Sequence, residues 1–93
     1  MMSLLINSVY PPPDPLFRVE LLSSGEHVLS HGIPIIKAIR HLTGLGLREA
    51  KELYDKVREG YNSIIKEGMS EGEAKIAKRE LEAAGGIAQI VRY

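Results

Sequence analysis

Alternation of apolar and polar residues with a period of two predicts strands near both ends of the sequence. In the stretch Leu16–Leu22 every second residue is apolar, and these residues are Phe17, Val19 and Leu21. The last stretch, Ile87–Tyr93, has one face made of Ile87, Gln89 and Val91. The pair Ile64-Ile65 inside Ser63–Lys66 marks a shorter strand candidate that ends near Gly68. We therefore expect three strands.

Between the predicted strands, apolar residues recur at helical spacing in three stretches. The first predicted helix runs from about Ile33 to Leu42, and its buried stripe consists of Ile35, Ala38, Ile39 and Leu42. The second runs from about Leu47 to Glu59, and its stripe consists of Leu47, Ala50, Leu53, Tyr54 and Val57. The third helix has a stripe of mostly small residues suited to close packing on a sheet: Ala74, Ala77, Leu81 and Ala84.

The helix boundaries have recognisable signals. Ser70 and Glu73 form a capping box, in which each side chain pairs with the backbone N–H of the other residue at the start of the third helix. Gly44 and Gly60 follow the first and second helices, where glycine is favoured. The resulting order is strand, helix, helix, strand, helix, strand. It predicts an α/β domain of the two-layer α+β type, with a three-stranded antiparallel sheet and three helices on one face.

The chain divides at a proline-rich stretch, in which four of the five residues 11–15 are proline. We expect one folded domain over 16–93, preceded by an apolar and proline-rich arm over 1–15. The segment Met1–Tyr10 contains four aliphatic residues, namely Leu4, Leu5, Ile6 and Val9. Such an arm can add a strand to a neighbouring copy and make a homo-oligomer, or it can pack on its own domain or stay disordered. The residues leave these alternatives open.

Composition narrows the range of functions. The chain has 93 residues, 44% of them apolar, and 12 basic residues balance 12 acidic ones, so no global charge attracts nucleic acid or membrane. It has no cysteine, which excludes disulfides and thiolate metal sites. No apolar run is long enough to span a bilayer. We expect a cytoplasmic protein, or one that a phage carries into a cytoplasm.

The first helix has an unusual outward side. At about 100° per residue, Ile33, Lys37 and Arg40 lie roughly opposite the buried stripe, with Ile36 at its flank. One interpretation is that Ile33 covers a loop and the cations are solvated. The other is a mixed apolar and basic docking surface for an acidic amphipathic partner. Lys51 lies at the margin of the next helix's stripe and would extend this surface, and Arg48 points further out.

Sequence motifs across the same region resemble a known family. The stretches Ile36–Arg40 and Thr43–Lys51 are similar to the motif of the C-terminal domain of the bacterial ribosomal stalk protein. Lys66–Ser70 and Leu81–Gly86 resemble that family's strand, capping box and closing glycine. The match extends from Leu16 to the C-terminus, and the Thr-Gly-Leu-Gly-Leu core followed by Glu-Ala-Lys is its most specific part. A related fold is found in the ClpS-type adaptors.

The resemblance implies a function as well as a fold. Domains of that family recruit translational GTPases to the ribosome, among them elongation factors Tu and G, through the first helix and the adjoining glycine turn. By this resemblance the partner-binding positions are Ile33, Ile36, Lys37, Arg40, Gly44, Leu45, Gly46, Arg48 and Lys51. Gly32 occupies a position that is basic in the family, and the family's dimerisation helices and hinge have no counterpart here. We therefore expect a stand-alone or phage-encoded relative that competes with or supplements the stalk.

Other functions are less well supported by the residues. A ClpS-like protease adaptor would need an acidic, histidine-containing pocket that has no clear counterpart here, and a self-assembling interaction protein remains an alternative. The basic residues of the second helix alternate with acidic ones, which favours pairs such as Glu52–Lys56 over direct nucleic-acid binding. His27 and His31 have metal-ligand spacing without an accompanying glutamate. We expect no catalytic residues, no metal and no cofactor.

Overall fold

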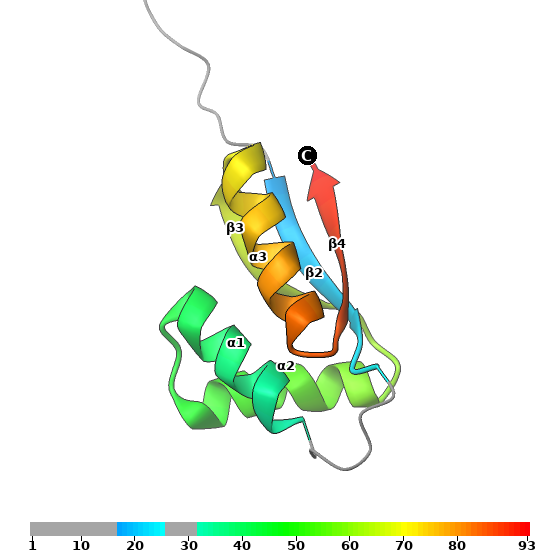
Figure 1. The fold of residues 1–93 in the computed structure, drawn as a ribbon. Coiled ribbons are helices and arrows are strands. Elements are labelled where there is room, and N and C mark those ends of the chain that lie inside the picture. Colours follow the sequence, from blue (N-terminus) through cyan, green and yellow to red (C-terminus); the bar gives the residue numbers. More distant parts are fainter. Residues whose placement is uncertain (1–16, 26–31) are drawn as a thin grey trace, which may run out of the picture.

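The computed structural model describes residues 17–25 and 32–93 (Figure 1). Its elements follow the predicted order: β2 (Phe17–Ser23), α1 (Ile33–Thr43), α2 (Leu47–Arg58), β3 (Ser63–Met69), α3 (Glu71–Ala83) and β4 (Ile87–Arg92). The predicted arm over 1–15, Leu16 and the connection containing His27 and His31 lie outside the described residues. None of the helices within the two described ranges is long and apolar enough to cross a membrane.

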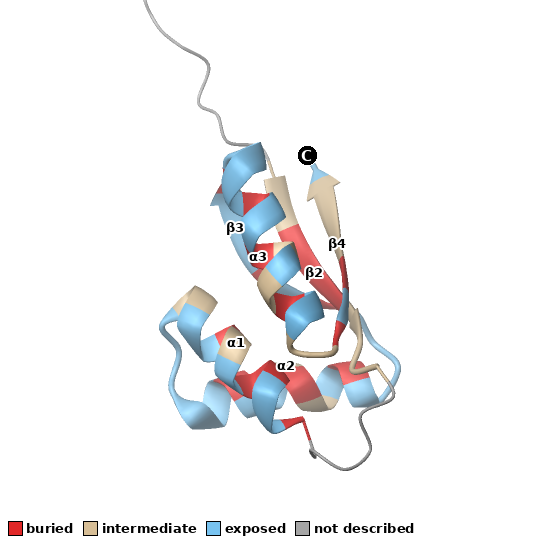
Figure 2. Ribbon diagram, in the orientation of Figure 1, coloured by how far each residue is buried: buried red, intermediate tan, exposed pale blue. Residues whose placement is uncertain are grey.

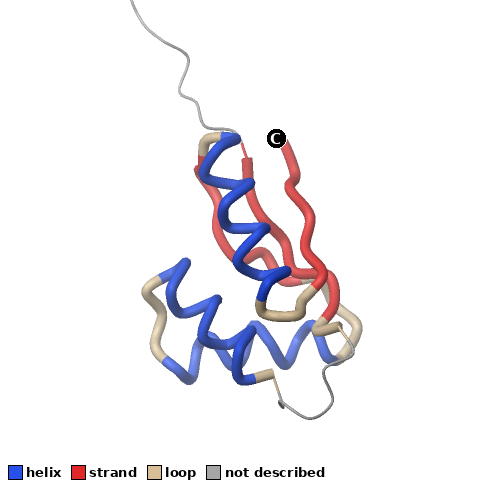
Figure 3. Tube along the Cα trace, in the orientation of Figure 1, coloured by secondary structure: helices blue, strands red, loops and turns tan. Residues whose placement is uncertain are grey.

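The three strands form one antiparallel sheet in the order β3-β2-β4, so β2 is central. The core-facing residues Val19 and Leu21 of β2 are fully buried, and they belong to the same cluster as buried residues of all three helices. The helices therefore share one side of the sheet. Figures 1 and 3 show α3 lying along the strands while α1 and α2 lie near one end. The predicted fold class is confirmed.

The core consists of apolar side chains that come from every element (Figure 2). Its largest fully buried members are Leu21, Ile35, Ile39, Leu81 and Val19. The alanines of α3 include Ala74 at 0% and Ala77 at 2% exposure, and small side chains at these positions let the helix approach the sheet closely. The prediction from their spacing is confirmed.

The face of β4 that consists of Ile87, Gln89 and Val91 lies on the side away from the core. In β4 the core side is formed by Ala88, which is 6% exposed, and by Ile90, whereas Ile87 is 52% exposed. The register explains this, because Ala88 and Ile90 pair with the buried Leu21 and Val19 of β2.

One predicted member of the buried stripe of helix α2 is wrong. Leu47 is 57% exposed, since it is the first residue of α2 and follows directly on the turn, where the helix has not yet reached the core. Strand β3 runs from Ser63 to Met69, one residue beyond its predicted end near Gly68, and Met69 pairs with Phe17 of β2.

The capping box at the start of α3 is confirmed. The Ser70 hydroxyl accepts a hydrogen bond from the Glu73 N–H at 3.2 Å, and the Glu73 carboxylate accepts one from the Ser70 N–H at 2.9 Å. The hydrogen bond from the Ser70 N–H, followed by the interaction with the Ser70 side chain, holds the pKa of the Glu73 carboxyl below its usual value. Two backbone N–H groups at the start of α3, those of Ser70 and Glu73, are thus satisfied by neighbouring side chains.

A polar group lies in the middle of the sheet, on the side away from the helices. The Glu20 carboxylate accepts a hydrogen bond from Gln89 Nε2 at 3.0 Å and another from Arg18 Nε at 2.8 Å. Its side chain is only 9% exposed. The hydrogen bond from Gln89, followed by that from Arg18, lowers the pKa of Glu20 below its ordinary value.

The central packing predicts a large effect of truncating Leu81. Leu81→Ala removes a fully buried side chain between α3 and the sheet, and it should lower the free energy of unfolding by about 2–5 kcal/mol. Ile76→Ala on the same helix removes a side chain that is 55% exposed and should cost well under half as much. Denaturant unfolding of both variants measures the difference, and equal losses would contradict the assignment of Leu81 to the core.

The Glu20 group predicts a dependence of stability on pH. Because the folded-state pKa lies below the unfolded one, ionised Glu20 contributes stability above the unfolded pKa, and this contribution is lost as the pH falls through the folded pKa. Glu20→Gln should therefore be less stable than the wild type at pH 7, with a difference that shrinks below about pH 4. Urea unfolding across pH 2–7 tests this, with the exposed Glu67→Gln as the control. A constant difference would contradict it.

Candidate functional site

The turn between α1 and α2 has a defined backbone geometry. Gly44 ends α1 in the left-handed conformation, with φ of 74°, and its N–H donates to the Arg40 carbonyl at 2.8 Å. The Thr43 hydroxyl donates to the Ile39 carbonyl at 2.6 Å and accepts from the Leu45 N–H at 3.1 Å. A residue with a side chain at Gly44 would have open space but a strained backbone, so φ rather than crowding requires glycine there. The turn holds Leu45 on the surface.

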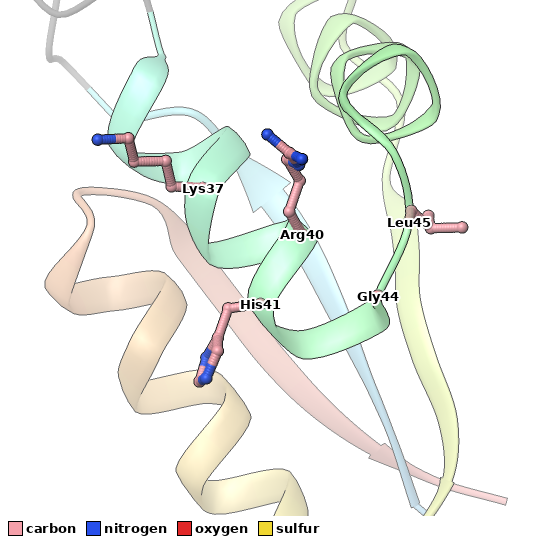
Figure 4. A pocket seen from close by; sticks show the side chains of 5 residues that line it. All are labelled: Lys37, Arg40, His41, Gly44 and Leu45. Atoms are coloured by element: carbon pink, nitrogen blue, oxygen red, sulfur yellow. The ribbon is translucent and has the colours of Figure 1, made fainter.

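An open depression lies beside this turn (Figure 4). The residues that line it are Lys37, Arg40, His41, Gly44 and Leu45. In Figure 4, Lys37 and Arg40 extend away from α3, whereas His41 points toward it. Both cations are exposed, and neither side chain has a hydrogen-bond or ion-pair partner among the described residues. The depression is therefore bordered by two uncompensated positive charges.

His41 contributes to the architecture in a different way. Its Nδ1 lies 2.9 Å from the Glu80 Oε1 of α3, and the contact is an ion pair only when the imidazole is protonated. This contact links the last turn of α1 to α3 near the depression. No local sequence pattern connects His41 with Glu80, because the two residues are 39 positions apart.

Several predicted site residues are exposed. Ile33, four residues before Lys37, is 56% exposed. Leu45, five residues after Arg40, is 37% exposed. The other exposed members of the predicted set are Gly44, Gly46, Arg48 and Lys51. The outward side of α1 that helical spacing predicted is thus present as an exposed surface.

Ile36 is an exception and requires a correction. We predicted that it lies at the flank of the surface and contacts a partner, but its side chain is 8% exposed and belongs to the core cluster. Helix α1 packs on α2, α3 and β3 at once, so its buried side is wider than a single stripe and includes both Ile35 and Ile36. Ile36 holds the helix in place rather than presenting a surface.

Two cations of α2, Arg48 and Lys51, are compensated locally. Lys51 Nζ lies 2.9 Å from the Asp55 carboxylate, and Arg48 Nε lies 3.8 Å from that of Glu52. The predicted pair Glu52–Lys56 is absent from the described ion pairs, because Glu52 points back toward Arg48. These exposed pairs contribute little to stability, but they reduce the positive potential of α2 relative to α1.

A contact that the sequence did not reveal requires glycine at position 32. Gly32 precedes α1 with φ of 78°, and a Cβ atom there would lie 2.0 Å from Cζ of Tyr54. Tyr54 is 6% exposed and packs its ring where a side chain at position 32 would begin. A basic residue at this position, as in the resembled family, is incompatible with the tyrosine. Helical spacing alone predicts for Tyr54 only a place in an apolar stripe.

Comparison with known proteins identifies the class to which this fold and surface belong. The family model for the ribosomal protein L7/L12 C-terminal domain matches residues 17–91. The chain belongs to this family, as the motifs had suggested.

Individual relatives support membership of the same family. The chain is 51% identical over 69 residues to the large ribosomal subunit protein bL12 of Lactococcus lactis subsp. lactis (strain IL1403), covering 74% of this chain and 50% of that protein. It is 46% identical over 74 residues to bL12 of Marinobacter nauticus (strain ATCC 700491 / DSM 11845 / VT8), covering 80% and 53% respectively. For bL12 of Campylobacter concisus (strain 13826) the identity is 43% over 74 residues, with coverage of 80% and 53%. The chain thus spans about half the length of the curated relatives it matches.

The packing of Gly32 on Tyr54 yields a prediction. Gly32→Ala places a side chain in the left-handed region and against the ring, so it should lower the free energy of unfolding by about 2–4 kcal/mol. Combining it with Tyr54→Leu should recover part of the loss, because the smaller side chain relieves the clash but not the backbone strain. A double-mutant cycle by denaturant unfolding measures the coupling. Strict additivity of the two changes would exclude the contact as the cause.

Proposed function

We propose that this chain is a protein-binding module of the ribosomal stalk type that docks translational GTPases, including elongation factors Tu and G, through α1 and the glycine turn. The observation that carries the proposal is the pair Lys37 and Arg40. Their side chains are exposed and unpartnered among the described residues, and they border the depression beside the turn. Membership of the L7/L12 C-terminal domain family supports the assignment to translation. The function lies in binding, with no catalytic role for the chain.

The surface suits an acidic, amphipathic partner helix. Lys37 and Arg40 attract acidic side chains, and long-range attraction raises the rate of encounter and sets the orientation. The exposed Ile33 and Leu45 then provide apolar area that the partner can cover. Since the cations have no partner to lose among the described residues, docking does not break an existing ion pair on α1.

The remaining predicted residues have secondary roles in this proposal. Lys51 extends the basic surface from α2, but it must exchange Asp55 for a partner carboxylate, and Arg48 must likewise leave Glu52. Gly44 and Gly46 let the partner approach the turn backbone closely. Ile36 acts only through the core, by fixing the position of the neighbouring Lys37.

The test is binding of the full chain to purified elongation factors Tu and G by titration calorimetry or interferometry. Lys37→Glu/Arg40→Glu should weaken binding by at least about tenfold, because it replaces both free cations with charges that repel an acidic partner. The matched control is Lys75→Glu/Arg79→Glu, which changes the net charge equally on α3. It should leave affinity within about twofold, since those residues lie away from the depression.

The outcomes separate a specific surface from general charge. Equal weakening by both double variants would mean that net charge alone drives the interaction. Absence of wild-type binding to either factor would exclude the proposed function, while the fold and the family would stand. Circular dichroism of each variant confirms that the domain is folded before binding is interpreted.

A further inference from the structure

The side of the sheet that faces away from the helices is unusually apolar. Antiparallel sheets covered on one side normally have polar residues on the other. Here Ile64 is 45%, Ile87 52% and Tyr93 51% exposed, and Val91 is partly exposed. Figure 1 shows α3 lying along the other side of the strands. No described element covers these apolar side chains.

The strand register places these residues on one face. Directly paired residues of antiparallel strands point to the same side, and Arg18 pairs with Val91 while Glu20 pairs with both Gln89 and Ile64. Ile87 shares this side by alternation along β4. The guanidinium carbon of Arg18 lies 5.5 Å from the centre of the Tyr93 ring, which brings Tyr93 to this side as well. We call this surface the outer face.

The polar groups of the outer face satisfy one another. Both oxygens of the Glu20 carboxylate accept hydrogen bonds, one from Arg18 and one from Gln89. The Tyr93 hydroxyl accepts a hydrogen bond from the Gly68 N–H at 2.8 Å. Covering the outer face therefore leaves these hydrogen bonds in place, so the cost of desolvation is lower than for unpaired groups.

We propose that the outer face is the docking site of the apolar segment Met1–Tyr10 of the same chain. The segment contains four aliphatic side chains that complement the exposed apolar ones: Leu4, Leu5, Ile6 and Val9. It has no charged side chain, so its burial carries no penalty for an unpaired charge. In this proposal the segment and the outer face are both apolar because each buries the apolar side chains of the other.

The part of the chain that precedes the described residues is long enough to run along the outer face. Sixteen residues precede Phe17, where the central strand β2 begins. Extended, Met1–Tyr10 spans about 33 Å, whereas the seven residues of β2 span about 23 Å. The dipeptide Asp14-Pro15 favours initiation of a turn at the point where the chain must reverse. The segment can therefore run back along the whole face.

Tethering favours the same chain over a second copy. A segment joined to its site by a short connection has an effective concentration in the millimolar range, far above the usual concentration of another protomer. Four prolines in residues 11–15 also reduce the entropy that the connection loses on docking. A neighbouring copy can bind the segment only at concentrations that approach this value.

Disulfide trapping in the full chain tests the proposal, because the protein has no cysteine of its own. Leu5→Cys is combined with Ile64→Cys on β3 or with Ile87→Cys on β4. The control combines Leu5→Cys with Leu47→Cys, which is 57% exposed at the start of α2 and thus matches Ile64 and Ile87 in exposure. In dilute protein under mild oxidation, at least one outer-face pair should form an intramolecular disulfide roughly tenfold or more faster than the control.

Each outcome is decisive. Equal rates for all three pairs would show that the segment does not dock on the outer face and would overturn the proposal. A disulfide-linked dimer as the main product of the outer-face pairs would also overturn it, in favour of exchange between copies. Faster intramolecular trapping should be abolished by adding Ile6→Asp, which makes the segment unfavourable to bury. Circular dichroism before oxidation verifies the folded state of every variant.

Discussion

Helix α1 packs against three neighbours at once, and this constraint determines what the domain can present to a partner. Its contacts with α2, α3 and β3 bury Ile35, Ile36 and Ile39. Only one side of the helix is left, and it carries both uncompensated cations of the depression. The position of the proposed docking surface is thus a consequence of core packing. A helix attached on one side only could rotate and change which residues it exposes, whereas this one cannot without exposing a buried isoleucine.

The parts of the fold that were predictable depend on local rules. Helical spacing identified the alanines of α3, and the capping box located its first residue, because both depend on residues a few positions apart. The outward side of α1 was predictable for the same reason. Periodicity alone did not identify the role of the glycine turn or the type of partner. The family resemblance supplied both as expectations.

The missed features depend on contacts between distant residues. The burial of Ile36 requires knowledge of how many neighbours α1 has, and the core side of β4 depends on its register with β2. The pairing of His41 with Glu80 and the fit of Tyr54 over Gly32 connect separate elements. Composition and residue spacing cannot identify contacts between residues that are far apart in the sequence. The outer face was similarly hidden, since Ile64 and Ile87 come from strands on opposite edges of the sheet.

The hydrogen bond from the Gly68 N–H to the Tyr93 hydroxyl connects the two edge strands of the sheet. Strands β3 and β4 each pair with β2 and lie on opposite sides of it. Tyr93 directly follows β4, and its side chain reaches the end of β3 beyond the central strand. The tyrosine thereby crosslinks two strands that share no backbone ladder, so separating either of these strand ends from β2 also breaks this bond.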